Sequence, residues 1–263
     1  MRSQEEKAAD FRALHAGEAF VIPNPWDAGS ARVLAALGFK ALATTSSGFA
    51  FTLGRRDGEA TLDDVVHHVE AIDQATDLPV SVDLENGYSA DPERAALAIL
   101  RVAEVGAVGG SIEDYDPGGR IYELKEAAER IAAASAVGRQ LAFGFTLTAR
   151  AENYIHQNPD LKDTIARLQA YEAAGADVLY APGLRTVEEI TAVCRAVAKP
   201  VNVLALPGLS LAQVIDAGAR RVSVGGGLTW VAVKAMADAA TAIRDTGDFS
   251  VLAARVPLDR WFA

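Results

Sequence analysis

Acidic residues cluster at the ends of two short apolar segments of this chain. Asp83 and Glu85 follow one segment, and Glu113 and Asp114 follow the next one. Short apolar runs are typical of buried strands, so the acids are expected where each strand leaves the core. Carboxylates gathered in a small space repel one another unless a cation or a proton offsets their charge. The pattern therefore predicts a site for a divalent cation.

The residue types in this cluster favour one kind of metal. Carboxylate oxygens are hard ligands, which Mg²⁺ prefers, with Mn²⁺ as the alternative. Zinc is disfavoured because the four histidines form no ligand pattern: His67 and His68 lie in a helical stretch, and His15 and His156 are isolated. The structural alternative, in which the acids cap loops or pair with arginine, stays open for any one of them.

Three further segments could bind an anion. The turn Thr45-Ser46-Ser47-Gly48 offers hydroxyls and backbone N–H groups that can hold a carboxylate or phosphate. Arg150 follows a strand and can bind a substrate carboxylate or pair with Glu113. Gly225-Gly226-Gly227 forms either a tight turn or a phosphate cradle, and the cradle would indicate a sugar-phosphate enzyme.

Eight short apolar segments alternate with amphipathic, helix-like stretches, as in a (β/α)8 TIM barrel. A doubly wound sheet is the alternative, but its Gly-rich first turn is absent. No linker interrupts the pattern, so residues 1–263 are predicted to form a single barrel domain. The expected strands are Ala19–Ile22, Lys40–Thr44, Pro79–Asp83, Gly110–Glu113, Ala142–Thr148, Asp177–Tyr180, Pro200–Leu204 and Arg221–Val224.

The helix-like stretches carry their own end signals. Asp91 is expected to cap a helix that begins at Pro92, a residue that suits a first turn. Glycines such as Gly106 and Gly175 are expected to end helices in the left-handed conformation. Further helices are predicted over residues 124–137, 161–173 and 187–197.

Bulk properties exclude several functions. The net charge of −10 and the lack of a basic cluster argue against nucleic-acid or anionic-membrane binding. The one cysteine, Cys194, cannot form a disulfide within the chain and is expected at a buried helix position. The absence of an apolar signal or a long apolar run predicts a cytoplasmic protein. Trp261 and Phe262 near the C-terminus predict packing on this subunit or a neighbour, and hence a homo-oligomer.

Several short motifs follow one another along this chain in a distinctive order and spacing. They are Asn24-Pro25-Trp26-Asp27-Ala28, Thr45-Ser46-Ser47-Gly48, Asp57, Asp83-Leu84-Glu85-Asn86-Gly87-Tyr88, Ile112-Glu113-Asp114 and Thr148-Ala149-Arg150. In these motifs the chain resembles the isocitrate lyase/phosphoenolpyruvate mutase superfamily, from about Ile22 to Leu228. The resemblance implies a (β/α)8 barrel, often with a swapped C-terminal helix, and action on small 2-oxo or 2-hydroxy acids through an enolate, or C–P bond cleavage.

The resemblance also implies roles for particular residues. Mg²⁺ would be held near Asp83, with Glu85 and Glu113 acting largely through waters, although Glu85 replaces the second acid of the family's Asp-x-Asp motif. Asp57 and Arg150 would act in catalysis, and Arg150 would also contact the substrate. The remaining substrate-binding residues expected at the rim are Trp26, Ser46, Ser47, Gly48, Asn153 and Tyr180.

One loop departs from the family pattern. The family's lyases carry Lys-Lys/Arg-Cys-Gly-His after strand four, whereas this chain has residues 116–122, without a thiol or a histidine. Isocitrate-type cleavage is therefore disfavoured, and oxaloacetate-type decarboxylation, which needs less from the loop, is favoured. Arg120 and Tyr122 are the nearby candidates for closing over the substrate. A phosphonopyruvate-type C–P enzyme and a catalytically silent 2-oxo acid binding protein remain alternatives.

Overall fold

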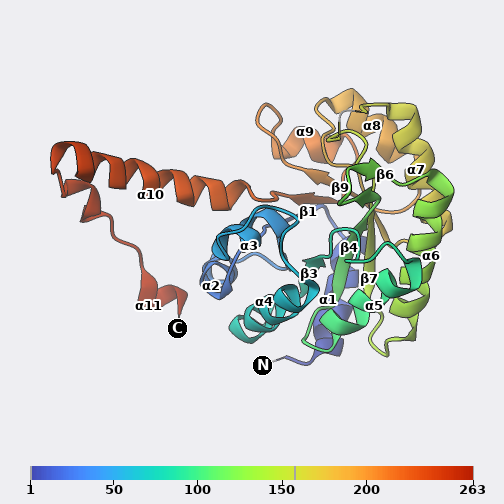
Figure 1. Ribbon diagram of the computed structural model, residues 1–263, viewed down its shortest axis with the longest axis horizontal. Helices are drawn as coiled ribbons and strands as arrows, with labels where there is room; N and C mark the ends of the chain where they lie inside the picture. The colour runs from blue at the N-terminus through green and yellow to red at the C-terminus, as the bar shows by residue number, and fades with distance from the viewer. Residues whose placement is uncertain (1, 157, 263) are drawn as a thin grey trace.

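The computed structural model describes residues 2–156 and 158–262, and its centre is a barrel of eight parallel strands (Figure 1). The sheet runs in the order β1-β10-β9-β8-β7-β4-β3-β2. Its two edge strands meet where the Ala43 N–H donates to the Pro23 carbonyl at 3.1 Å, which nearly closes the barrel. The strands are β1 (Phe20–Ile22), β2 (Leu42–Ala43), β3 (Val80–Asp83), β4 (Gly109–Glu113), β7 (Thr146–Arg150), β8 (Val178–Tyr180), β9 (Val201–Leu204) and β10 (Arg221–Ser223).

The predicted (β/α)8 barrel is confirmed, with one strand displaced. The fifth strand was expected at residues 142–148, but β7 begins at Thr146. The Gly144 N–H donates to the Leu141 carbonyl at 3.1 Å, and Gly144 has a φ of 70°. The first residues of the predicted segment therefore belong to a turn with Gly144 in the left-handed conformation, and the strand begins only after it.

The loop after β4 forms a small hairpin. Strands β5 (Tyr115–Asp116) and β6 (Arg120–Ile121) pair antiparallel, with Tyr115 opposite Ile121. The segment that departs from the family pattern is therefore an ordered hairpin beside the end of strand β4.

Helices surround the barrel, and the four whose positions were predicted, α5 to α8, lie within three residues of the predicted bounds. Asp91 caps α5 by accepting from the Arg94 N–H at 2.9 Å, and Gly175 has the expected positive φ of 101°. Cys194 is half-buried on α8, where burial raises its pKa to about 11. The helices are α1 (Gln4–Ala16), α2 (Ala28–Ala36), α3 (Ser46–Thr52), α4 (Leu62–Ala75), α5 (Pro92–Ala103), α6 (Leu124–Gln140), α7 (Leu161–Ala173), α8 (Val187–Ala196), α9 (Leu211–Asp216), α10 (Gly227–Thr246), the 3₁₀ turn η1 (Ser250–Ala253) and α11 (Leu258–Trp261).

Helix α1 packs its apolar residues against the barrel strands. Ala8 and Phe11 are fully buried and pack with Ile22 and Val108. A Cβ at Gly109 would lie 2.8 Å from the Phe11 ring, so glycine permits this close approach. The substrate-sized opening of the barrel must therefore lie at the opposite, carboxyl end of the strands.

Helix α10 projects away from the barrel as an arm (Figure 1). Thr229 is its one buried residue among those described, while Val231 and Met236 are 68% and 62% exposed. The chain then turns back so that Phe262 lies under the Arg32 guanidinium, 5.4 Å from the ring centroid, and remains 49% exposed. Packing of the C-terminal aromatics on their own subunit is therefore partial. Among the described helices, none combines the length and apolarity needed to cross a bilayer.

Candidate active site

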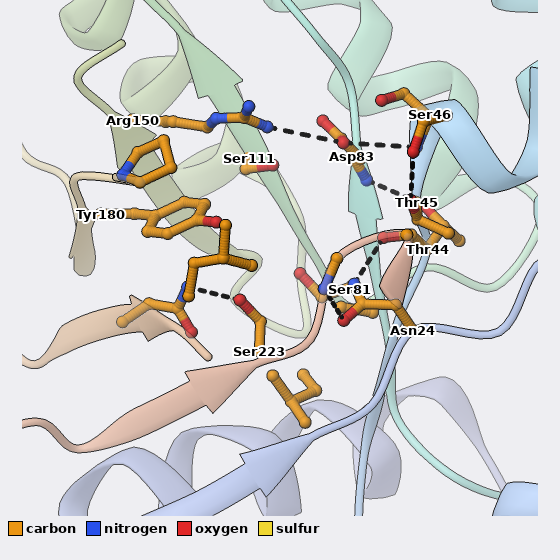
Figure 2. A pocket seen from close by; sticks show the side chains of 18 of the residues that line it. Asn24, Thr44, Thr45, Ser46, Ser81, Asp83, Ser111, Arg150, Tyr180 and Ser223 are labelled. Atoms are coloured by element: carbon orange, nitrogen blue, oxygen red, sulfur yellow. Dashed lines mark hydrogen bonds and ion pairs between the residues drawn. The ribbon is translucent and has the colours of Figure 1, made fainter. Parts of the chain in front are cut away.

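Polar side chains from several strand ends surround a cavity of about 180 Å³ at the carboxyl end of the barrel (Figure 2). Arg150 from β7 points toward Asp83 from β3, and Ser46 at the start of α3 lies on the far side of Asp83. Barrel enzymes place their active sites at this end of the strands. The predicted site residues that line this cavity are Ser46, Ser47, Asp57, Asp83, Arg150 and Tyr180.

Arg150 is the centre of the charge network. Its Nη1 lies 3.6 Å from Asp83 and 3.4 Å from Glu113, and its Nε bonds Glu152. Burial opposes a charged guanidinium, but Glu152, Glu113 and Asp83 raise the pKa of Arg150 well above its ordinary value. One cation thus faces three carboxylates. The sequence left open whether Arg150 binds a substrate carboxylate or pairs with Glu113. The structure is compatible with both roles, because Arg150 pairs with Glu113 and also lines the cavity.

The carboxylates beside Arg150 remain crowded. Burial, followed by the charges of Asp83 and Asp57, raises the pKa of Glu85 to about 7. Burial also raises the pKa of Glu113 well above its ordinary value, although Arg150 opposes the shift. Like charges in a partly buried site are relieved by a proton or a further cation. The site therefore has more negative charge than Arg150 alone neutralises.

This donor set fits a magnesium ion in its chemistry. Asp83, Glu85 and Glu113 supply hard oxygen ligands, and their crowding is what a divalent cation would relieve. Within residues 2–156 and 158–262, no group of three or more His, Cys, Asp or Glu side chains is arranged to hold a metal. Mg²⁺ usually keeps several waters and takes one or two carboxylates, so a complete protein cage is not required.

The loop after β3 holds its acid in an unusual backbone conformation. Glu85 and Tyr88 have φ values of 47° and 59°, a region that residues other than glycine rarely adopt. The Tyr88 hydroxyl donates to Glu85 Oε1 at 3.2 Å, and the Glu85 N–H donates to Asp83 Oδ1 at 3.3 Å. Such conformations cost about 1–3 kcal/mol each and cluster at functional sites.

The Thr45–Gly48 turn begins helix α3 beside the acids. Thr45 is the N-cap, and the Ser46 N–H donates to Asp83 Oδ2 at 3.4 Å. A Cβ at Gly48 would lie 2.5 Å from Thr229 Oγ1, so Gly48 serves close packing and does not line the cavity. Thr45, Ser46 and Ser47 are the residues of this turn that line the cavity.

The glycine turn after β10 does not form an open phosphate cradle. Asn24 Oδ1 accepts from the N–H groups of Val224 at 3.0 Å and Gly225 at 2.9 Å. A Cβ at Gly226 would lie 2.6 Å from Ser47 Oγ, so the turn packs tightly against the serine segment. Because two of its amides are already bonded within the protein, the tight-turn interpretation is favoured over a sugar-phosphate site.

The two loop candidates for closing over a substrate lie away from the cavity. Tyr122 is fully buried, and its hydroxyl accepts from Asn86 Nδ2 at 3.1 Å. Arg120 is on the hairpin surface and pairs with Glu126 at 2.9 Å. The hairpin turns Tyr122 into the core, where its ring packs under the Arg130 guanidinium. In this structure neither side chain reaches the reacting region, contrary to the sequence-based expectation.

Three other predicted residues have mainly structural surroundings. Trp26 lines a separate shallow pocket between α3 and α10. Asn153 is fully buried and bonds the Thr164 hydroxyl, which anchors the loop after β7. Asp114, although adjacent to Glu113, pairs with Arg167 at 3.0 Å and accepts from the Glu152 N–H at 2.8 Å. It positions the neighbouring loop and does not face the cavity.

A second cavity, of about 330 Å³, adjoins the first and contains a histidine that the sequence left isolated. His156 lies in its wall with Glu85 and Glu113, and its Nε2 is 3.3 Å from Glu152 Oε2. Its ring stacks on Tyr115 of the hairpin. The sequence signal that could have found it is the four-residue spacing from Glu152, which Arg150 in turn bonds.

The fold is that of a (β/α)8-barrel enzyme, and an acidic, arginine-containing cluster lies at the end of the barrel where such enzymes place their active sites. The family model of phosphoenolpyruvate phosphomutase matches residues 11–244. The chain therefore belongs to the phosphoenolpyruvate mutase family, within the isocitrate lyase/phosphoenolpyruvate mutase superfamily, and is an enzyme of this type.

Individual relatives agree with this assignment. A Burkholderia cenocepacia J2315 structure with a provisional lyase/mutase assignment is 51% identical, covers 98% of this chain and 97% of its own, and superposes with a TM-score of 0.96. The 2-methylisocitrate lyase of Halalkalibacterium halodurans is 30% identical over 86% of this chain and 74% of its own length. A structure of oxaloacetate acetylhydrolase with its product oxalate is 26% identical, with 98% and 92% coverage and a TM-score of 0.89.

Proposed function

We propose that this chain is a Mg²⁺-dependent enzyme that acts on a small 2-oxo or 2-hydroxy acid through an enolate. The most strongly supported reaction is C–C bond cleavage, as a lyase or an oxaloacetate-type decarboxylase. The observation that carries this proposal is Arg150 held between Asp83 and Glu113 beside the serine turn. The cavity of about 180 Å³ is smaller than the roughly 300–1,000 Å³ typical of drug-sized ligands. It therefore suits an acid of a few carbons.

Asp83 would hold the metal directly, with Glu85 and Glu113 acting through bound waters. When bound, Mg²⁺ supplies a Lewis acid that stabilises negative charge developing on the 2-oxo oxygen. Mn²⁺ shares this preference for oxygen ligands. This role is supported by the raised pKa values of Glu85 and Glu113, which reflect burial and crowding that a cation would relieve.

The chain's own residues would bind and orient the acid. Ser46 and Ser47 can donate hydroxyl hydrogen bonds to the substrate carboxylate, and Arg150 adds a fixed positive charge near the reacting carbons. Asp57 lines both cavities, and burial raises its pKa. Tyr180 forms the wall under Arg150, whose guanidinium carbon lies 5.4 Å from the ring centroid.

The reaction also needs a proton for carbon. When CO₂ leaves, the electrons of the broken C–C bond remain on the enolate, and a proton must reach its carbon to give the product. We assign this donation to the His156 imidazole, with Glu152 holding the ring in place. Glu152 is suited to this because Arg150, then His156, lower its pKa despite its burial. His156 would take the role of the thiol that the loop after β4 lacks.

Two alternatives remain distinguishable. The matching family model is that of a phosphomutase, which keeps phosphonopyruvate-type C–P chemistry as the second candidate. Both reactions would use the same carboxylate-binding residues and the same metal. A catalytically silent 2-oxo acid binding protein is the third candidate, and the position of His156 in the wall of the acidic cavity argues against it.

A substrate panel tests the proposed reaction. Purified protein is incubated with oxaloacetate, phosphonopyruvate or 2-methylisocitrate, each with Mg²⁺ and with a chelator, and products are followed by NMR. We expect Mg²⁺-dependent conversion of oxaloacetate to pyruvate. Turnover of phosphonopyruvate alone would instead establish an enzyme that acts on C–P bonds. Binding of 2-oxo acids without turnover of any of them would establish a catalytically silent binding protein.

We further propose that the protein is a homo-oligomer in which a second copy covers the α10 arm. The argument is the apolar surface of this arm, with Val231, Met236, Phe249 and Leu252 all at least 60% exposed. We expect Met236→Glu to lower the mass measured by sedimentation, because it puts a charge into the covered surface. Thr241→Glu adds the same charge at an exposed polar position of α10 and serves as the control. A wild-type protein that sediments as a monomer would refute the assembly.

A further inference from the structure

A buried arginine in the barrel interior has no acidic partner among the described residues. Arg221, the first residue of β10, is 5% exposed, and none of the described salt bridges includes it. Its three side-chain hydrogen bonds go to neutral groups. They reach Asn202 Oδ1 at 2.9 Å, Thr148 Oγ1 at 3.0 Å and His15 Nε2 at 3.3 Å.

The histidine at this site is itself neutral. Burial, followed by the charge of Arg221, lowers the pKa of His15 to about 3. Its Nδ1 lies 2.8 Å from the Phe11 carbonyl, so Nδ1 carries the proton and Nε2 accepts from Arg221. The guanidinium charge is therefore not balanced by its neighbours.

Arg221 also keeps unused hydrogen-bonding capacity. A guanidinium has five N–H donors, and the three bonds to protein atoms leave two of them without a partner among the described residues. Burying a charge is costly unless it is paired and hydrogen-bonded. A ligand anion would satisfy both needs at once.

The cavity that contains the acidic centre extends down to this arginine. Arg221, Ser223 and Asn202 line the same 180 Å³ space as Asp83 and Arg150. Barrel interiors are usually filled by bulky branched side chains. Here Ser81, Ser111 and Ser223 stand at inward positions and leave a polar hollow, and Figure 2 shows Ser81 and Ser223 below the Arg150–Asp83 pair.

The two arginines are spaced suitably for one small molecule. Thr148, which bonds Arg221, and Arg150 lie two residues apart on β7, which corresponds to about 6.6 Å along a strand. The two carboxylate carbons of a four-carbon diacid are separated by three C–C bonds, roughly 4 Å in space. The carboxylate oxygens and their hydrogen bonds extend this reach further. One four-carbon diacid can therefore contact side chains at the height of Arg150 and also the Arg221 guanidinium.

We propose that Arg221 and the serine-lined hollow above it form a binding well for a second carboxylate of the substrate. This assignment rests on the proposed function and narrows it to linear dicarboxylic acids. One carboxylate would lie at the metal edge with Ser46 and Ser47, and the other would descend to the Arg221 guanidinium. An acid with a single carboxylate would leave the buried charge of Arg221 unpaired, so the well discriminates by an electrostatic difference.

Calorimetric titration with malate and lactate in the presence of Mg²⁺ tests the well. These acids differ by one carboxylate, and neither has the 2-oxo group that would let it decarboxylate. We expect wild type to bind malate more tightly than lactate. In Arg221→Met the malate Kd should rise about ten- to a hundredfold, the loss of a hydrogen-bonded charge pair, while the lactate Kd is unchanged.

A second variant and a control separate binding from folding. Ser111→Val narrows the hollow, leaves Arg221 in place and removes none of the described side-chain hydrogen bonds, so it should also weaken malate selectively. Arg220→Met makes the same chemical change at the exposed neighbouring position and should alter neither Kd. Equal binding of the two acids by wild type, or equal losses for both in Arg221→Met, would overturn the well. The oxaloacetate assay tests the proposed function separately. If oxaloacetate is not turned over, the proposed reaction is wrong, but a preference for malate over lactate in binding would still support the well.

Discussion

Replacing Asp83 by asparagine is expected to lower kcat/KM about a thousandfold and to raise the Mg²⁺ concentration needed for half-maximal rate. The size corresponds to the loss of one preorganised electrostatic contact at a developing charge. Asparagine keeps the shape of the side chain but removes the charge that would ligate the metal. It also turns an amide toward Arg150 Nη1, which lies 3.6 Å from the present carboxylate.

The Asp83 variant should remain folded, so that its defect is chemical. Asp83 belongs to an excess of negative charge, and its removal relieves one cause of the raised pKa of Glu85. The thermal unfolding midpoint is therefore expected to stay the same or to rise. Asp63→Asn, at a side chain that is 72% exposed on α4, is the matched control and should leave the rate unchanged. If the Asp83→Asn enzyme keeps the wild-type kcat/KM and the wild-type metal dependence, the assignment of Asp83 as a direct Mg²⁺ ligand is refuted.

Replacing His156 by glutamine is expected to lower kcat about a hundred- to a thousandfold, within the range of general acid catalysis. Glutamine can still hydrogen-bond Glu152 but cannot donate a catalytic proton. The loss should appear in kcat, because the variant has no group at this position that can protonate the enolate carbon. Steady-state kinetics with oxaloacetate measure this loss, and KM should change little because the carboxylate-binding residues are untouched.

A matched histidine gives the control for this experiment. His67 is exposed on α4, outside both cavities, so His67→Gln makes the same change without reaching the site. It should keep the wild-type kcat. If His156→Gln also retains the kcat of the wild type, the proton comes from solvent or another group, and the assignment to His156 fails.

The barrel was readable from the sequence because its signals are local. Alternating apolar runs and amphipathic stretches report burial within a few residues, and Asp91 with Pro92 marks a helix start by its own chemistry. The start of β7 was predicted four residues too early for the same reason. The turn at Gly144 contains the first residues of the apolar run that was assigned to this strand. Sequence periodicity shows that a run of residues is apolar, but it does not show which of these residues belong to a turn and which to the strand.

The acidic edge of the site was also accessible from the sequence. Parallel strands in a barrel end at one rim, so Asp83, Glu113 and Arg150 had to approach one another once their strands were recognised. Arg120 and Tyr122 show the limit of this logic. Both follow a strand end, but the hairpin turns one outward and buries the other. Side-chain direction in a loop depends on tertiary packing that spacing alone does not reveal.

The sequence by itself determined the fold, the superfamily and the acidic, arginine-containing rim of this protein. Only the tertiary structure decided that His156 stands beside Glu152 in the acidic cavity and that Arg221 closes the well below it. The reason is physical. Arg221 meets His15, which is 206 residues away, and Thr148, which is 73 residues away, through contacts that exist only when the barrel closes. The unpaired charge of Arg221 appears only once burial has removed it from water.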